Sequence, residues 1–375
     1  MRAVAATGVH HQPAHQVDHR DHFAGNVFGS SVRVHVFEFI CGGGLGLQPS
    51  LSASLAREGD LMLAAVLDDL LELPHVEVSF ARDARLALPQ LRFAGQQKRA
   101  ARACWRSPGA PPAEAFAREI SSSDAVWPIA PETGGELERA ARAVLDAHRM
   151  LLGSQPRAIA VAGSKSATAQ RLQEKGIAVV PCFLPGEVWP AIDGPWVVKP
   201  DDGAGGLRSS VFETRELAAR AVAGATGKGE AKLVAQPWIE GDAMSLCALA
   251  SPHAVVALSV NRQHLRIEPS ELQLQAIEVN CEPVDAQLAR LTQQVAEAIP
   301  GLRGYFGIDF VRGPSGPVVI EVNPRLTTSY AGLRAALGWN VAQWVLADAA
   351  GEPLPPSPAT PRRTVTLKLN GEAIG

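Results

Sequence analysis

The residues best suited to chemistry lie near the C-terminal end, where two strand-like runs flank Gly-Pro-Ser-Gly-Pro at positions 313–317. Such a cluster is typical of a hairpin turn. If the hairpin is centred on Ser315, Asp309 pairs with Glu321, and Asn323 shares their face because side chains alternate along a strand. Two carboxylates and an amide oxygen on one rigid face suit Mg²⁺ or Mn²⁺. The hairpin therefore predicts a metal site.

The register of this hairpin also makes a prediction about its other face. That face is apolar and should pack in the core through Ile308, Phe310, Val318, Ile320 and Val322. Paired carboxylates repel each other, so a positive charge should lie between Asp309 and Glu321. The alternative to a metal is a structural ion network in which an arginine supplies this charge, and the candidates are Arg303, Arg312 and Arg325. We favour the metal.

A second group of residues suits an anion. An apolar strand-like run ends at Lys199, and Gly203, Gly205 and Gly206 follow it. A glycine-rich loop can turn its N–H groups toward an anion, and a lysine beside it adds a point charge. A plain β-turn would seldom need three such glycines, so we predict a phosphate site. Lys165, at the start of a helix, is on these residues alone an ordinary surface lysine, and its surroundings lack the glycine spacing of a Walker A loop.

Strands alternating with helices precede these residues and indicate a parallel α/β layer. A glycine-rich loop at 41–46 follows the first strand, and Glu132 follows the third. Ligands of open α/β sheets bind at the carboxyl ends of strands. The loop at 41–46 could equally be a tight strand-to-helix connection, and Glu132 could equally be a residue that starts a helix. We expect strands at 32–40, 76–80 and 124–130, and helices at 49–57, 60–72, 113–120, 136–151 and 331–349. A surface loop or short helix should span 90–112, and a proline-rich linker 353–361.

Composition excludes several classes of protein. The net charge of −3 gives no footprint for nucleic acid, and no apolar run approaches the ~18 residues of a membrane span. The five scattered cysteines argue against zinc sites and disulfides and for a reducing, cytoplasmic location. Residues 1–31 hold five of the ten histidines without apolar periodicity. We expect a disordered tail there, with a metal-binding tail as the alternative.

The Asp-(eleven residues)-Glu-x-Asn-Pro-Arg pattern that ends at Arg325 resembles the metal-binding end of an ATP-grasp domain. This family contains carboxylate–amine and carboxylate–thiol ligases and related carboxylases. The similarity runs from about residue 158 to 349. It implies that Lys165 and the Lys199 loop contact the phosphates of ATP, although Ser164 replaces the usual Asp or Asn. It also implies an adenine site and a ribose-binding acid in the segment 236–242, from Gln236, Trp238, Ile239 and either Glu240 or Asp242.

The resemblance implies the fold class and the domains. It predicts an α/β and α+β architecture, namely an ATP-grasp fold with a small α/β pre-ATP-grasp domain before it. After the tail at 1–31, the pre-ATP-grasp domain would span 32–157. The first ATP-grasp subdomain would span 158–235, and the second, with the metal hairpin and a C-terminal strand, would span 236–375.

Four short stretches are more narrowly similar to the tyramine–glutamate ligases of methanofuran biosynthesis. They begin at Phe37, Pro131, Asn261 and Asn323. This similarity implies an ADP-forming ligase that uses ATP and Mg²⁺ (or Mn²⁺) to join a small-molecule carboxylate to an amine through an acyl phosphate. Arg325, Lys199 and Arg262 would be the catalytic residues. A non-catalytic nucleotide-binding regulator and another carboxylate-activating ATP-grasp enzyme are the alternatives. The sequence leaves the oligomeric state open, with a dimer as one option.

Overall fold

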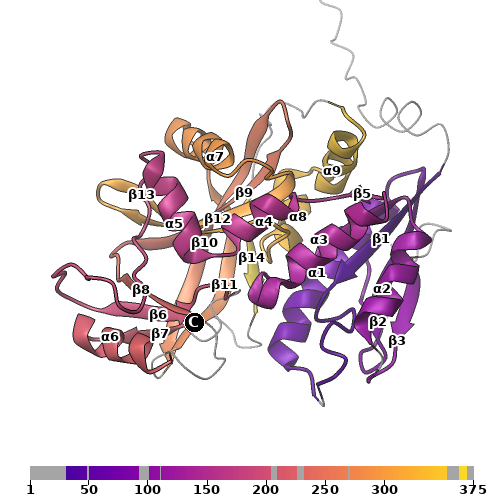
Figure 1. Ribbon diagram of the computed structural model, residues 1–375. Coiled ribbons are helices and arrows are strands. Elements are labelled where there is room, and N and C mark those ends of the chain that lie inside the picture. The colour runs from indigo at the N-terminus through magenta and orange to yellow at the C-terminus, as the bar shows by residue number, and fades with distance from the viewer. Residues whose placement is uncertain are drawn as a thin grey trace, which may run out of the picture.

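A computed structural model describes residues 31–48, 50–92, 101–109, 111–203, 209–225, 232–268, 271–352 and 363–369. In its N-terminal part a five-stranded parallel sheet has the order β3-β2-β1-β4-β5. The strands are β1 (Val32–Glu38), β2 (Val76–Asp83), β3 (Arg102–Arg106), β4 (Ala125–Ile129) and β5 (Met150–Leu151). This parallel sheet, seen at the right of Figure 1, confirms the α/β layer expected from the sequence.

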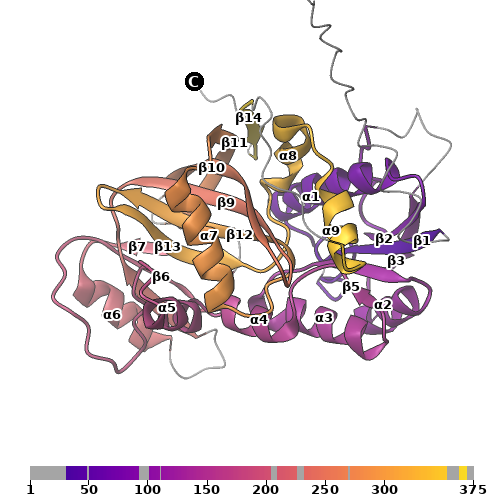
Figure 2. The same cartoon turned by 90° about the horizontal axis from the view of Figure 1, so that it is seen from above.

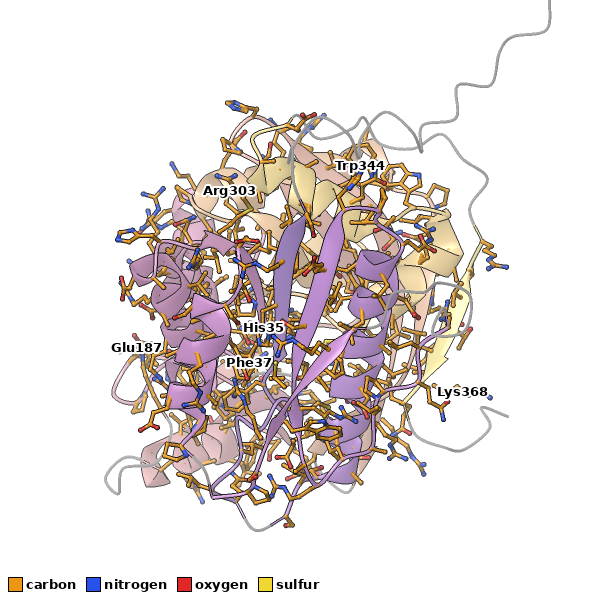
Figure 3. All side chains as sticks on the ribbon, turned by 90° about the vertical axis from the view of Figure 1, so that its right-hand side faces the viewer. His35, Phe37, Glu187, Arg303, Trp344 and Lys368 are labelled. Atoms are coloured by element: carbon orange, nitrogen blue, oxygen red, sulfur yellow. The ribbon has the colours of Figure 1, made fainter. Side chains whose placement is uncertain are left out.

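Helices cover both faces of this sheet, as parallel sheets require. The long helix α1 (Ala53–Leu71) packs on one face, where Val34 and Val36 point. Helices α2 (Pro112–Ser121) and α3 (Glu136–Asp146) pack on the other, against Phe37. Figure 3 views this domain with His35 and Phe37 labelled on β1. The short helices η1 (Thr133–Gly135), α4 (Pro156–Ala162) and α5 (Lys165–Glu174) then lead into the second part of the chain.

The second part contains, among the described residues, a nine-stranded sheet of order β13-β12-β9-β10-β11-β7-β6-β8 with β14 paired to β11. Helix α6 (Arg215–Gly224) packs on β6, β7 and β8, and α7 (Ala286–Ala298) packs on β9 and β10. The strands are β6 (Trp196–Pro200), β7 (Ser210–Phe212), β8 (Leu233–Pro237), β9 (Asp242–Ala250), β10 (Val255–Glu268), β11 (Glu271–Glu282), β12 (Gly304–Gly313), β13 (Gly316–Asn323) and β14 (Val365–Lys368).

The two parts share a hydrophobic core. Helices α8 (Tyr330–Leu337) and α9 (Val341–Ala349) lie between the second sheet and α1, as Figure 2 shows. One buried cluster runs from β1 and α1 through these helices to β9, β11 and β12. Of the helices in the described ranges, none combines the length and the apolar character that a membrane span needs.

Several expected element bounds are wrong for identifiable reasons. A single helix, α1, replaces the predicted pair 49–57 and 60–72, because Gly59 continues the helix and its missing Cβ makes room for Glu38. The predicted loop 90–112 contains strand β3. One predicted helix, 331–349, is two helices, because Gly338 adopts φ +75° and ends α8. The tail 1–30 and the linker 353–361 lie outside the described residues.

The hairpin of β12 and β13 confirms the predicted register at its base. Asp309 pairs with Glu321, with Gly307 opposite Asn323. A β-bulge between Asp309 and Phe310 then shifts the pairing by one residue, so that Phe310 lies opposite Val319. The prediction that Val318 and Ile320 pack in the core is therefore wrong. Val319 is fully buried in the core, and Ile320 lines a cavity on the other face.

Candidate functional site

A cavity of about 1000 Å³ lies between the N-terminal sheet and the second part of the chain. Its N-terminal wall comes from the end of β1, from α1 and from the loop after β4. The opposite wall comes from β6, β8, the inner side of the β10–β11 hairpin, and the β12–β13 hairpin. Lining residues include Glu58, Thr133, Lys165, Lys199, Gln236, Gln263, Asp309, Ile320, Glu321, Asn323 and Arg325. Residues from positions 38 to 329 thus meet around one space.

The two carboxylates of the hairpin lie side by side in this cavity but have different partners. Asp309 accepts a hydrogen bond of 3.1 Å from the side-chain amide of Asn323 and another of 3.1 Å from that of Gln263. Glu321 faces the ammonium of Lys165, with 3.2 Å between Nζ and Oε2. The candidate metal residues Asp309, Glu321 and Asn323 are therefore brought together.

Their environments move the pKa values of the two carboxyls in opposite directions. Burial and the charge of Glu321 raise the pKa of Asp309 to about 7. Burial also opposes ionisation of Glu321, but the charges of Lys165 and Lys199 outweigh it and lower the pKa of this carboxyl. Two like charges at one site do not both ionise easily without a cation. A divalent cation would replace the proton that Asp309 otherwise retains.

The donor set fits a hard cation with few protein ligands. Within the described ranges, no group of three or more His, Cys, Asp and Glu side chains is placed to hold a metal. Asp309 and Glu321 supply carboxylate oxygens, and the amide oxygen of Asn323 could complete the protein ligands. Mg²⁺ usually keeps waters and substrate phosphates in its remaining positions. The open cavity beside the hairpin leaves room for them.

Two buried lysines, one at the start of α5 and one on β6, face this hairpin. Lys165 is 6% exposed and donates to the carbonyl oxygen of Gly203 as well as to Glu321. Burial would lower the pKa of Lys165, but Glu321 outweighs it and the pKa is raised. Lys199 is 8% exposed, and burial lowers its pKa. Cations that are this desolvated interact strongly with a phosphate placed between them.

The start of α5 is held by Asp201, at the end of β6. Its carboxylate accepts from the Ser164 hydroxyl and from the Ser166 backbone N–H, both at 2.8 Å. The Lys165 backbone N–H also donates to the Asp201 carbonyl at 2.9 Å. These bonds fix the direction in which Lys165 leaves the helix. Of the predicted glycines, Gly203 lines the cavity, whereas Gly205 and Gly206 lie outside the described residues.

The predicted adenine segment also lies on the cavity wall. Gln236, Trp238 and Ile239 line it, and the Gln236 amide donates to the carbonyl oxygen of Val180 at 3.3 Å. Of the two candidate ribose acids, Asp242 lines the cavity and Glu240 does not. Sequence reasoning left this choice open.

The two candidate catalytic arginines are placed differently. Arg325 lines the cavity and pairs with Glu132, with 3.0 Å between Nε and Oε1. Arg262 does not line it and instead pairs with Asp242 at 3.2 Å. Side chains alternate along β10, so the neighbour Gln263 points inward in its place.

Sequence reasoning did not assign a role to Gln263, Glu38, Glu58 or Asp201. Gln263 lies in the short motif that begins at Asn261, but the irregular registers of β10 hide which face of the strand it takes. The other three show no local motif, because their positions depend on contacts between segments that are distant in sequence.

Two family models match successive parts of the chain. A family model described as an ATP-grasp domain matches residues 162–329, and one described as a pre ATP-grasp 3 domain matches residues 76–159. No curated protein matches the chain in sequence.

Solved structures share the architecture. An ATP-grasp superfamily protein from Archaeoglobus fulgidus has 21% identity and a TM-score of 0.62, covering 90% of this chain and 92% of its own. The L-amino acid ligase from Bacillus licheniformis has 17% identity and a TM-score of 0.58, covering 87% and 75%. The N5-carboxyaminoimidazole synthetase from Staphylococcus aureus, solved with ADP, has 14% identity and a TM-score of 0.63, covering 88% and 79%. Identities this low establish a common fold and leave the substrates open.

Proposed function

From its ATP-grasp domain and the pre-ATP-grasp domain before it, we propose that this protein is an ATP-dependent ligase that joins a carboxylate to an amine. The carboxylate would be phosphorylated to an acyl phosphate, with release of ADP. Attack by the amine would then form the amide and release phosphate. The observation that carries the proposal is the paired Asp309 and Glu321, which face Lys165 and Lys199 in a cavity that reaches the N-terminal domain.

The protein's own residues would act mainly by positioning and by charge, as in other phosphoryl transfers. Asp309, Glu321 and Asn323 would hold Mg²⁺ or Mn²⁺. When bound, the metal would neutralise charge on the transferring phosphoryl group. Lys165 and Lys199 would hold phosphate oxygens from the opposite side. Their burial excludes water that would otherwise screen these charges.

The remaining wall residues would orient nucleotide and acid. Gln236, Trp238 and Ile239 line the part of the cavity proposed for adenine, and Asp242 is the better-placed acid for ribose. Arg325 would grip or stabilise the donor carboxylate, because its guanidinium is a fork that matches a carboxylate. Glu132 keeps this guanidinium in the cavity wall. Arg262 would act on the substrate only through Asp242, its ion-pair partner.

We further propose an acidic amino acid such as glutamate as the donor and tyramine or a related amine as the acceptor, in methanofuran-type cofactor biosynthesis. The short motifs that resemble tyramine–glutamate ligases support this choice. All four motifs reach the cavity, through Glu38 to Ile40, through Pro131 and Thr133, through Gln263, and through the segment from Asn323 to Thr328.

The test is ADP release, measured with acids and amines supplied singly and in pairs. Glutamate should stimulate turnover, and tyramine should increase it further, with ADP and phosphate formed in equal amounts. AMP and pyrophosphate would instead mean adenylation and would refute the acyl phosphate. ATP binding without turnover on any pair would support the non-catalytic regulator.

A further inference from the structure

The N-terminal wall of the cavity presents one face of α1. Leu55, Glu58, Gly59 and Met62 all line the cavity, at spacings of three, four and seven residues from the first. This spacing is that of a single helix face. Below we call these four residues the α1 stripe. The carboxylate of Glu58 lies between two apolar side chains on this stripe, and it has no role in the mechanism proposed above.

The carboxylate of Glu58 has no close basic partner among the described residues. In the part of the chain that the structure describes, no hydrogen bond or ion pair to its carboxylate is found, and burial raises its pKa. Glu119 and Glu132, by contrast, form ion pairs with Arg106 and Arg325. The more distant charge of Arg325 also acts on Glu58, but burial outweighs it and the pKa of Glu58 stays raised. A cationic ligand would therefore lower the cost of ionising this carboxylate.

The second carboxylate of this wall, Glu38, has a different use. It accepts a 2.6 Å hydrogen bond from the Cys41 backbone N–H and so holds the glycine-rich turn that follows β1. Gly59 permits this arrangement, because a Cβ there would lie 2.6 Å from Glu38 Oε2. Glu38 is therefore committed to the protein's own backbone, whereas Glu58 remains available. Burial also raises the pKa of Glu38 to about 7, so Glu58 is the main source of negative charge on this wall.

The position of Glu58 suits the attacking nucleophile. Glu58 and Arg325 line the same cavity, so this carboxylate shares the space with the guanidinium proposed to hold the donor. An acid donor would be repelled by this wall, whereas an ammonium would be attracted. Apolar side chains on the same wall of the cavity would accept an uncharged body attached to that ammonium: Phe39, Ile40, Leu45 and Ile129, with Leu55 and Met62 of the stripe.

We propose that the α1 stripe is the binding site for the amine substrate, with Glu58 as the residue that holds its ammonium and the apolar side chains as the surface for its aryl or alkyl body. The inference rests on the proposed ligase function and adds the residue and the chemical class that select the amine. A charge-assisted hydrogen bond of this kind is strong and directional.

The test compares Glu58→Gln with the natural protein, using ATP, glutamate and tyramine. The KM for tyramine should rise about tenfold or more, as expected for loss of one charge-assisted contact, while the KM values for ATP and glutamate stay within about twofold. Glu58→Asp should recover part of the loss. Glu114→Gln, on the exposed surface of α2 and outside the cavity, is the matched control and should change none of them.

Hydroxylamine separates this inference from the proposed function. It is uncharged at neutral pH and traps an acyl phosphate as a hydroxamate, so it does not need an ammonium site. Glu58→Gln should form hydroxamate from glutamate as fast as the natural protein does. If the natural protein forms neither hydroxamate nor ADP, the ligase function fails.

The amine site is then tested by calorimetry in the presence of ATP and Mg²⁺. Tyramine should bind, its neutral analogue tyrosol should bind at least tenfold more weakly, and Glu58→Gln should remove this difference. An unchanged KM or affinity for tyramine in Glu58→Gln would overturn the inference. So would an increase in the KM for glutamate alone, or no binding of tyramine, phenethylamine or hexylamine to the natural protein.

Discussion

Replacing Asp309 with asparagine should stabilise the metal-free protein while abolishing Mg²⁺-dependent turnover. Asp309 is partly buried opposite Glu321, and burial together with that charge raises its pKa from its ordinary value of 3.8 to about 7. In the unfolded chain this carboxyl ionises at its ordinary pKa. Keeping it ionised in the folded protein therefore costs free energy, and asparagine removes that cost.

The size of the effect follows from these values and from two hydrogen bonds. At about 1.4 kcal/mol per pH unit, a pKa raised from 3.8 to about 7 corresponds to about 4 kcal/mol. Asn323 and Gln263 each donate to Asp309 at 3.1 Å, and an asparagine can accept well from only one of them. Losing one such bond to a charged group costs about 1.5–3 kcal/mol. The variant should be more stable by about 1–2 kcal/mol, a rise of a few degrees in Tm.

The difference in stability between the natural protein and Asp309→Asn should depend on pH. Below about pH 4 Asp309 is protonated in both folded and unfolded states, so the charge cost is absent. Between about pH 4 and pH 7 only the folded state retains the proton, so the stability of the natural protein falls as pH rises. The stability gap should therefore open across this range and be constant above it. Glu321 stays ionised throughout, because its pKa is lowered.

Urea unfolding in EDTA at about pH 5 and about pH 8 measures this gap. The exposed Asp193→Asn is the control and should show no gap at either pH. Adding Mg²⁺ and ATP should stabilise the natural protein more than Asp309→Asn. An Asp309→Asn protein that is less stable than the natural one at the higher pH, or a gap that is equal at both, would refute the charge-repulsion argument.

Two further substitutions test the walls of the cavity. Lys199→Ala removes a buried cation from the proposed phosphate site, so the KM for ATP should rise about tenfold or more. Unchanged ATP affinity and turnover would mean that Lys199 does not contact the phosphates. Gly59→Ala would place a Cβ 2.6 Å from Glu38 Oε2, so unfolding by urea should show a loss of about 1–3 kcal/mol, although alanine favours a helix by about 1 kcal/mol. A stabilised Gly59→Ala would mean that α1 can move away from β1.

Sequence patterns predicted the structural features that depend on residues close together in the chain. The glycine–proline turn and the alternation around it fix the pairing of Asp309 with Glu321, because both signals lie within one hairpin. The bulge that follows cannot be seen in the same pattern, since Val318, Val319 and Ile320 are all apolar and any of them could face the core. Its location depends on packing against β9 and α5, which are distant in sequence.

Dependence on contacts with distant segments also explains why the prediction for Arg325 and the prediction for Arg262 had different outcomes. The resemblance at the stretch that begins at Asn261 implied a catalytic Arg262, but a one-residue choice of face decides which side chain enters the cavity. β10 pairs with β9 and β11 through irregular registers, so counting from either end of the strand gives different answers. Gln263 faces inward and Arg262 outward. Arg325, next to the hairpin whose register was predictable, does line the cavity.

The loop after β4 carries contacts that no local pattern contains. Glu132 pairs with Arg325, 193 positions away in sequence. Thr133 donates its hydroxyl to the carbonyl oxygen of Asp202 at 2.9 Å, and the Gly134 backbone N–H donates to the Asp202 carboxylate at 2.8 Å. One loop of the N-terminal domain therefore holds both the arginine beyond the β12–β13 hairpin and the start of the glycine-rich loop. Separating the two domains would break both sets of bonds, so the geometry of the proposed phosphate site depends on the domain that presents the α1 stripe.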